Sequence, residues 1–144
     1  MGSRTWSKEY FKSVNPWEVI IIYREFNPNP KGRAVGDCAV RALCAALDVD
    51  WDTAYAMLAS EGYIMKDMPS SDAVWGSVLI KNGFAREACP ECREGYNADE
   101  FLKEHNTGKY VIAFGGHVAA ADNGILLDSW DSENEIPIYY YKKV

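Results

Sequence analysis

Residues 36–47 read GDCAVRALCAAL, and this run predicts the central helix of the fold, from Asp37 to Leu47. Apolar side chains recur in it at helical spacing and form one stripe, made of Val40, Leu43, Cys44 and Leu47. Alanines fill much of the remaining surface, and a helix that is apolar nearly all round is usually buried. Small alanine side chains would also let another element approach closely.

Cys38 falls in the first turn of this predicted helix, on the side opposite its apolar stripe. Unpaired backbone N–H groups and the positive end of the helix dipole gather there, and both favour a thiolate. The same N–H groups can hold an oxyanion. Cys38 is therefore a candidate nucleophile, with inert packing as the alternative. Cys44 lies on the stripe and is expected to be core.

Two strands near the end of the chain meet at Asn123-Gly124, a strong signal for a two-residue hairpin turn. In that register Asp122 faces Ile125. His117, which begins the first strand, and Asp128, at the end of the second, then lie on one face as diagonal neighbours. A three-residue turn would move Asp128 to the opposite face.

The chemistry of a cysteine nucleophile explains why these residue types would be brought together. A thiol at neutral pH needs a base close by, and an imidazole needs a carboxylate or amide to fix its orientation. The pattern predicts Cys38 as nucleophile, His117 as base and Asp128 as the orienting acid. Trp130 faces His117 in the same register and could shield that bond from water.

Other interpretations of these residues stay open from the sequence. His117 can be a half-buried strand histidine, and His105 sits near a helix C-terminus, where the dipole favours histidine anyway. Arg41 follows Asp37 by four residues, a favourable helix pair that competes with a role in binding substrate. Asp122 and Asp131 are rival orienting acids.

The rest of the chain predicts helices first and an antiparallel sheet afterwards, an α+β pattern. A short helix is expected at 4–14, a strand at 17–26 and a loop at 27–32. Three further helices are expected: from Asp50 or Asp52 to about Ser60 with Gly62 as its stop, from Ser70 or Ser71 to Asn82-Gly83, and from Asn97 to His105. Strands are expected at 109–114, 117–121, 125–129 and 136–142.

Length and composition indicate a single domain and argue against several classes of partner. The chain has 144 residues, the size of one domain, and we treat residues 1–26 as an N-terminal extension. A net charge of −6 without a Lys/Arg cluster argues against nucleic acid and anionic membranes as partners. The longest apolar run is far too short to span a bilayer, and no export signal is visible. Four cysteines are few for a disulfide-built domain, so a reduced, cytoplasmic protein is expected.

Cys89-Pro90-Glu91-Cys92 is a CxxC motif with three interpretations. A structural zinc site requires four ligands, and His105 is one candidate for the third, but the sequence suggests no fourth. A thioredoxin-like redox site needs a βαβ context that this region lacks. A plain loop is the simplest interpretation, and no metal or other cofactor is expected.

Three features of the chain together resemble the papain-like cysteine peptidase superfamily. A cysteine begins a buried helix at residues 36–43, a histidine opens a strand at residues 117–121, and a second strand ends in Asp128-Ser129-Trp130. The last run resembles the Asn-Ser-Trp of papain-type enzymes with Asp in place of Asn. The order Cys, His, Asp is also that of the superfamily. The resemblance implies a papain-like α+β fold, with the cysteine helix packed on a C-terminal antiparallel sheet.

A closer similarity is to small, uncharacterised papain-like proteins encoded by phages and bacteria. It rests on residues 29–42, on the His-Val strand and on the Asp-x-Trp-Asp end, and it spans most of residues 27–131. Papain-type enzymes usually carry a Gln six residues before the cysteine as second oxyanion donor, where this chain has Gly32. A loop side chain from Asn27, Asn29 or Lys31 would have to replace it, and Asn29 is the one we select.

The expected function is a cysteine hydrolase that cleaves an amide, peptide or isopeptide bond of a protein or peptide substrate. Cys38, His117 and Asp128 form the expected triad, with Asn29 assisting, while Trp130 and Asp37 are expected to contact substrate. The same triad would serve an acyltransferase or a deamidase. A catalytically inactive binding module that reuses the fold is the alternative of a different kind.

Overall fold

A computed structural model describes residues 6–15 and 18–144, and their elements confirm the α+β class. The helices are α1 (Cys38–Leu47), α2 (Trp51–Met65), α3 (Asp72–Lys81) and α4 (Ala98–Glu104). The strands are β1 (Trp6–Asn15), β2 (Glu18–Phe26), β3 (Phe84–Ala88), β4 (Lys109–Phe114), β5 (His117–Asp122), β6 (Ile125–Asp128) and β7 (Tyr139–Lys143).

The strands form one sheet in the order β1-β2-β6-β5-β4-β7-β3. The expectation of a purely C-terminal antiparallel sheet is wrong, because β2 joins the sheet beside β6 and runs parallel to it. β3 was not predicted either. Its sequence, Phe84-Ala85-Arg86-Glu87-Ala88, is poor in the β-branched residues that mark strands, and only pairing with β7 reveals it.

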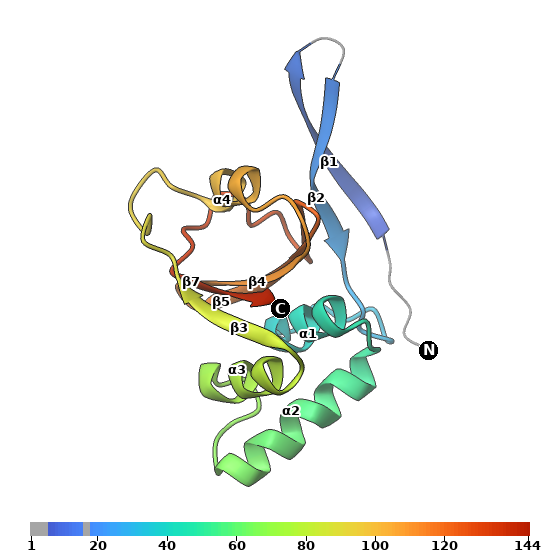
Figure 1. Ribbon diagram of the computed structural model, residues 1–144. Coiled ribbons are helices and arrows are strands. Elements are labelled where there is room, and N and C mark those ends of the chain that lie inside the picture. The colour runs from blue at the N-terminus through green and yellow to red at the C-terminus, as the bar shows by residue number, and fades with distance from the viewer. Residues whose placement is uncertain (1–5, 16–17) are drawn as a thin grey trace.

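The short helix expected at 4–14 is also wrong: residues 6–15 form β1, and residues 4 and 5 lie outside the described residues. β1 pairs antiparallel with β2, from Trp6 opposite Phe26 to Asn15 opposite Glu18. A partner strand overrides a weak local helix preference, and aromatic residues such as Tyr10 and Phe11 suit a strand. The β1–β2 hairpin rises away from the rest of the molecule (Figure 1).

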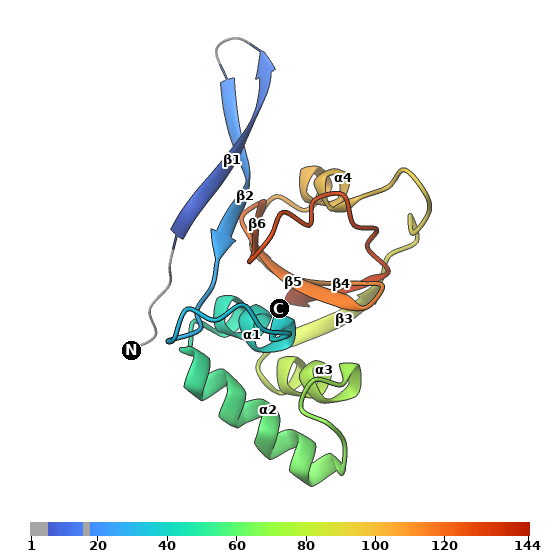
Figure 2. The same cartoon turned by 180° about the vertical axis from the view of Figure 1, so that it is seen from behind.

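Two apolar cores lie on the two faces of this sheet. On one face, α1 packs against β5, β6 and β4, with α2 and α3 outside it, as both views show (Figures 1 and 2). On the other face, α4 lies over a second cluster that includes Phe101. The predicted central helix is confirmed, since every residue from Ala39 to Ala46 is buried.

The helix ends follow the capping signals closely, with one correction. Asp50 caps α2 by accepting from Thr53 N–H at 2.8 Å, but this helix runs past the expected stop at Gly62. Gly62 is needed there for a different reason: a Cβ would lie only 2.8 Å from the Asp67 carbonyl oxygen. The caps predicted for α3 and α4, Ser71 and Asn97, are confirmed.

Candidate active site

The side chains of the predicted triad come from three separate elements. Cys38 is the first residue of α1, His117 the first of β5 and Asp128 the last of β6. The two-residue turn is confirmed, because Asp122 pairs with Ile125 and both turn residues, Asn123 and Gly124, have positive φ. α1 packs directly on β5, which brings the helix start next to the strand start.

His117 and Asp128 are joined by a short hydrogen bond: Nε2 of the imidazole donates to Oδ2 of the carboxylate at 2.6 Å. Asp128 has no exposed surface, and His117 is only partly exposed. With Nε2 engaged, Nδ1 is the ring nitrogen left for the thiol of Cys38, with which the imidazole also interacts. The structure therefore brings the three predicted residues together in one series, with the imidazole between the thiol and the carboxylate.

The electrostatics of this series favour a charged pair. The hydrogen bond to His117 lowers the pKa of the Cys38 thiol below its ordinary value, against an opposing effect of burial. Burial alone would lower the pKa of His117, but hydrogen bonds to Asp128 and Cys38 outweigh it and raise that pKa to about 9. A thiolate beside an imidazolium is the state that these shifts stabilise.

The contact of Arg41 with Asp128 was missed by sequence reasoning, which had considered this arginine only as a partner of Asp37 or of substrate. The Arg41 side chain is buried and donates to Asp128 Oδ1 from Nε at 3.2 Å and from Nη2 at 3.0 Å. Nη1 donates to Asp37 Oδ1 at 2.6 Å, so the predicted helix pair exists. Nothing in the local pattern signals the contact with Asp128, because 87 residues separate the two. The guanidinium compensates two buried carboxylates at once.

Asp128 accepts two further hydrogen bonds that hold it in place. Ser132 Oγ donates to Oδ2 at 2.7 Å, and the backbone N–H of Ser129 donates to Oδ1 at 2.8 Å. Both carboxylate oxygens thus have more than one donor, which fixes the rotamer that faces His117. The carboxylate that contacts His117 is thus itself rigidly oriented.

Asp37 was expected to contact substrate, and the structure places its carboxylate in a different set of contacts. Oδ1 accepts from Arg41, and Oδ2 accepts from Trp51 Nε1 at 2.9 Å. Asp37 occupies the N-cap of α1 yet makes no side-chain cap to the helix. The carboxylate of Asp37 therefore does not occupy the N–H groups of the first turn, which is the kind of position where an oxyanion can bind.

Trp130 lies beside the histidine as the register predicted. Its ring is tilted over the His117 imidazole, with centroids 4.9 Å apart, and 45% of its surface is exposed. Phe114 stacks on His117 with centroids 6.0 Å apart. The two rings limit access of water to the imidazole, while the exposed part of Trp130 is open to a ligand. Its role in binding substrate stays a prediction.

Asn29 lies in the turn at 29–32 that precedes the cysteine. Its side-chain oxygen accepts from Lys31 N–H at 2.9 Å, and its carbonyl oxygen accepts from Gly32 N–H at 2.9 Å. These contacts use oxygen atoms of Asn29 and leave the side-chain NH2 as the group that would donate to an oxyanion. Its assignment as second donor stays a prediction.

The CxxC motif forms an irregular turn remote from these contacts. Cys92 N–H donates to the Cys89 carbonyl oxygen at 3.2 Å, and Cys89 is buried while Cys92 is exposed. Among the residues that the structure describes, no group of three or more His, Cys, Asp or Glu is arranged to hold a metal ion. His105 stacks on Phe101 with ring centroids 4.0 Å apart.

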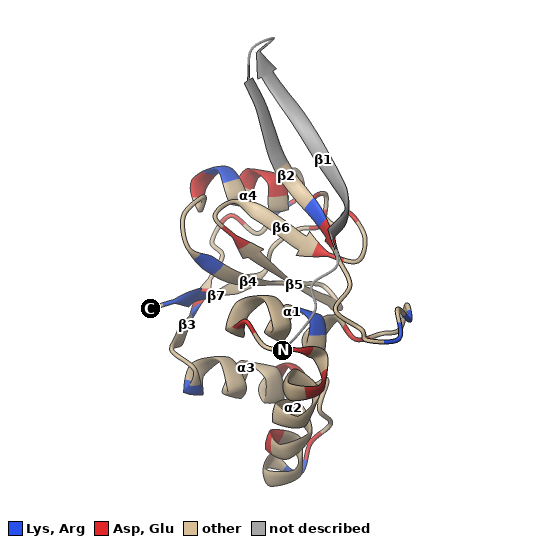
Figure 3. Ribbon diagram, turned by 90° about the vertical axis from the view of Figure 1, so that its right-hand side faces the viewer, with Lys and Arg blue, Asp and Glu red and all other residues tan. Residues whose placement is uncertain are grey.

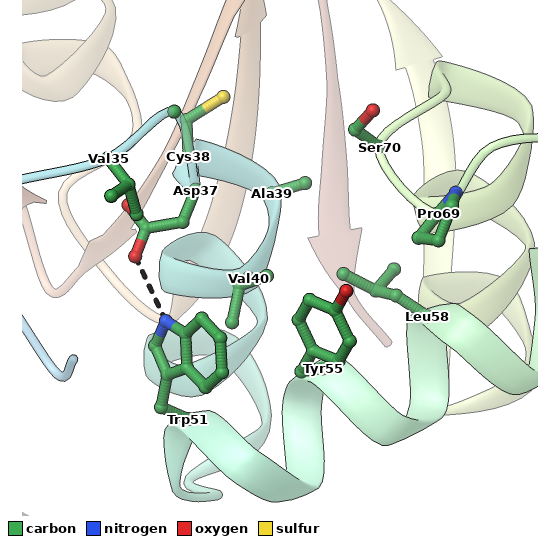
Figure 4. Close-up of a pocket in the computed structure, with 11 residues that line it drawn as sticks. Val35, Asp37, Cys38, Ala39, Val40, Trp51, Tyr55, Leu58, Pro69 and Ser70 are labelled. Atoms are coloured by element: carbon green, nitrogen blue, oxygen red, sulfur yellow. Dashed lines mark hydrogen bonds between the residues drawn. The ribbon is translucent and has the colours of Figure 1, made fainter. Parts of the chain in front are cut away.

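A cavity of about 340 Å³ lies next to Cys38, at the N-terminal end of α1. Figure 4 shows Asp37 and Cys38 at one side, Pro69 and Ser70 at the opposite side, and side chains of α1 and α2 between them. The lining is largely apolar. The proposed nucleophile therefore borders a space into which part of a ligand could fit.

Lys and Arg residues are dispersed over the described elements and do not gather on one of them (Figure 3). Across the part of the chain that the structure describes, no helix is both long and apolar enough to cross a bilayer. Comparisons with protein-family models, curated proteins and solved structures found no significant match. The case for a function therefore rests on the geometry of the site.

Proposed function

We propose that this chain is a papain-like cysteine hydrolase that cleaves an amide bond, in a peptide or an isopeptide linkage. One observation carries the proposal: His117, which interacts with Cys38, also donates a 2.6 Å hydrogen bond to the fully buried Asp128. A core histidine needs no such arrangement. A thiol nucleophile needs both a base and a group that orients the base.

In the proposed reaction the Cys38 thiolate attacks the carbonyl carbon of the amide, and the carbonyl oxygen becomes an oxyanion. The His117 imidazolium then gives its proton to the leaving amine, the C–N bond breaks and a thioester forms on Cys38. Water, deprotonated by His117, attacks the thioester and releases the acid and the thiol. Asp128 keeps the ring oriented throughout and stabilises its charged form.

The oxyanion would be held at the N-terminus of α1. The backbone N–H of Cys38 is one donor, helped by the positive end of the helix dipole. Asn29, from the preceding turn, is our choice for the second donor in place of the Gln that papain-type enzymes use. The uncapped N-terminus of α1 supports the placement of the oxyanion there, because Asp37 is held by Arg41 and Trp51 and does not occupy those N–H groups.

The arrangement of elements is compatible with a papain-like fold. A buried helix that begins with the cysteine packs on strands that carry the histidine and the acid, in the order Cys, His, Asp. The mixed sheet and the N-terminal strands are features of this chain beyond that resemblance.

The deciding experiment is the pH dependence of iodoacetamide alkylation at each cysteine, read by mass spectrometry. Cys38 should react rapidly well below pH 8, because its pKa is lowered, and its reactivity should fall only as the pH drops through that lowered pKa. In His117→Ala the largest lowering influence is gone and burial remains, so the profile should move to the alkaline side. His105→Ala is the matched histidine control and should leave the profile unchanged.

An ordinary, alkaline profile for Cys38 in the wild type, or one unaffected by His117→Ala, would contradict the proposal and favour a binding module. Acyl transfer is tested separately. Adding an amine acceptor such as glycinamide to a reaction with a pooled synthetic peptide library would give mass adducts on the products if an amine, and not water, resolves the thioester.

A further inference from the structure

We propose that the cavity beside Cys38 binds an apolar side chain of the substrate, aromatic or branched aliphatic, on a residue that flanks the amide under attack. This inference rests on the proposed function, and it assigns a substrate class to the site. It is argued from the lining of the cavity, from its charge and from its continuity with the nucleophile.

The position of the cavity ties its occupant to the reaction. Cys38 itself is part of the lining, together with Gly36 and Asp37 from the chain just before it. A group that fills the cavity therefore lies beside the sulfur that would attack. A carbonyl held at the start of α1 would place the adjacent substrate residue at the mouth of this space.

The lining selects for apolar surface. Val40 comes from α1, while Trp51, Tyr55 and Leu58 come from one face of α2, and Pro69 closes the opposite side (Figure 4). Trp51 and Tyr55 stack on each other with ring centroids 5.1 Å apart and planes 19° from parallel. This pair offers a broad aromatic wall on which an aromatic ring or a branched chain packs favourably.

The charge of the lining excludes ionic side chains. Of the eleven residues around the cavity only Asp37 is ionisable to a carboxylate, and its two oxygens already accept from Arg41 and Trp51. Cys38 is also in the lining, and as a thiolate it is paired with the imidazolium of His117. A lysine or glutamate side chain entering the cavity would therefore lose its water without gaining an unpaired ionic partner, which is unfavourable. The hydroxyl of Ser70 and the phenol of Tyr55 are the polar groups that a ligand would meet.

The size of the cavity limits what enters. About 340 Å³ is at the lower end of the range for small-molecule sites, enough for one large side chain and not for an extended peptide. Tyr55 is 47% exposed, so the wall that it forms is open to solvent on its outer side and accessible from outside. The cavity thus fits a side-chain subsite.

The test uses chloroacetamide and four N-substituted derivatives with the same electrophile. The substituents are 2-phenylethyl, 3-methylbutyl, 2-carboxyethyl and 2-aminoethyl. In each reaction the Cys38 thiolate displaces chloride, so a C–S bond forms and a C–Cl bond breaks. Rates at Cys38 are divided by the rate of unsubstituted chloroacetamide, which removes differences in thiolate reactivity.

The two apolar derivatives should label Cys38 about tenfold faster than the parent or more, the factor expected for taking one apolar group out of water. The two charged derivatives should gain nothing. Tyr55→Asp should remove most of the preference for 2-phenylethyl and raise the relative rate of the 2-aminoethyl derivative several-fold. Tyr63→Asp is the matched control, since Tyr63 is 77% exposed on the same helix outside the cavity, and it should keep the wild-type preference.

Equal relative rates for all four derivatives on the wild type would overturn the inference, and so would an unchanged preference in folded Tyr55→Asp. If that variant does not fold, Tyr55→Ala takes its place and should weaken the aromatic preference. The failure of the proposed function looks different: the parent chloroacetamide itself would then label Cys38 slowly, and only at alkaline pH.

Discussion

Cys38 and Cys89 are both at least partly buried, and yet their surroundings move their thiol pKa values in opposite directions. Cys38 stands at the start of a helix beside His117, and its pKa is lowered. Cys89 lies in a turn beside Glu91, and burial raises its pKa above the ordinary value. The sulfur of Cys89 is 3.7 Å from Glu91 Oε2, an acceptor that favours the neutral thiol.

The contrast teaches that a short motif is a weak guide to cysteine chemistry. The CxxC at 89–92 is the more familiar pattern, but it contains no histidine and no basic side chain. Cys38 has no second cysteine in its motif, and its imidazole neighbour comes from a strand that begins 79 residues later, at His117. Reactivity is thus set by the partners that the fold supplies.

The largest expected effect is a loss of turnover, which should follow substitution of Cys38 but not of Cys89. Cys38→Ala should lower turnover by about a thousandfold or more, because the nucleophile is lost, while the folded state is retained. Cys89→Ala should keep the wild-type rate. The measurement is cleavage of the fastest-cut member of a pooled synthetic peptide library, with thermal unfolding as the check on folding. A Cys38→Ala protein that still cleaves the peptide would contradict the role of Cys38 as nucleophile, and Cys38 would then not differ from Cys89 in function.

A second experiment asks what the buried guanidinium contributes around Cys38. Arg41→Met would leave two buried carboxylates, Asp37 and Asp128, without their shared cation. Breaking a buried pair in this way should cost about 3–5 kcal/mol in the free energy of unfolding, measured by urea denaturation. It should also slow alkylation of Cys38 at neutral pH, since Arg41 helps to lower that pKa.

The control for this substitution is Lys103→Met, at an exposed lysine of α4 that pairs with Glu100 at 3.3 Å and with Asp99 at 3.5 Å. A surface pair of this kind is worth at most about 1 kcal/mol. If the two substitutions proved equally mild, Arg41 would not be what holds the charges of the site together. The double variant Arg41→Met with Asp128→Asn should be less destabilised than the sum of its parts predicts.

The smallest expected effect concerns the other cysteine. Glu91→Gln removes a negative charge that raises the pKa of Cys89, but burial, the larger influence, remains. Alkylation of Cys89 at pH 9 should therefore rise by only about two- to threefold. Alkylation as fast as that of Cys38 would show that charge, and not burial, keeps Cys89 inert.

Sequence patterns predicted those parts of the site that depend on local spacing. The Asn123-Gly124 turn set the register of β5 and β6, and that register brought His117 and Asp128 together. The stripe of α1 and the caps Asp50, Ser71 and Asn97 were likewise local signals. Such features depend on residues a few positions apart, so a single sequence contains them.

The parts that were missed depend on pairing between distant segments. β1 was expected to be a helix because its partner β2 cannot be seen from its own sequence. β3 has a composition that suits a helix or a loop, and it is a strand only because β7 lies beside it. The bond from Arg41 to Asp128 belongs to the same class, since its i,i+4 partner Asp37 had already explained the arginine.

The parallel pairing of β2 with β6 has a consequence for the order of events in folding. Tyr23 from β2 donates its hydroxyl to the Asp128 carbonyl oxygen at 3.2 Å, across 105 residues of chain. Contacts so far apart in sequence form slowly, because the entropy cost of closing a long loop comes before the contacts can stabilise the fold. While the ribosome is still making residues 39–116, neither His117 nor Asp128 exists in the chain to act with Cys38. The nascent chain thus lacks the largest influence that lowers the pKa of the Cys38 thiol, and the site is complete only when β5 and β6 have docked.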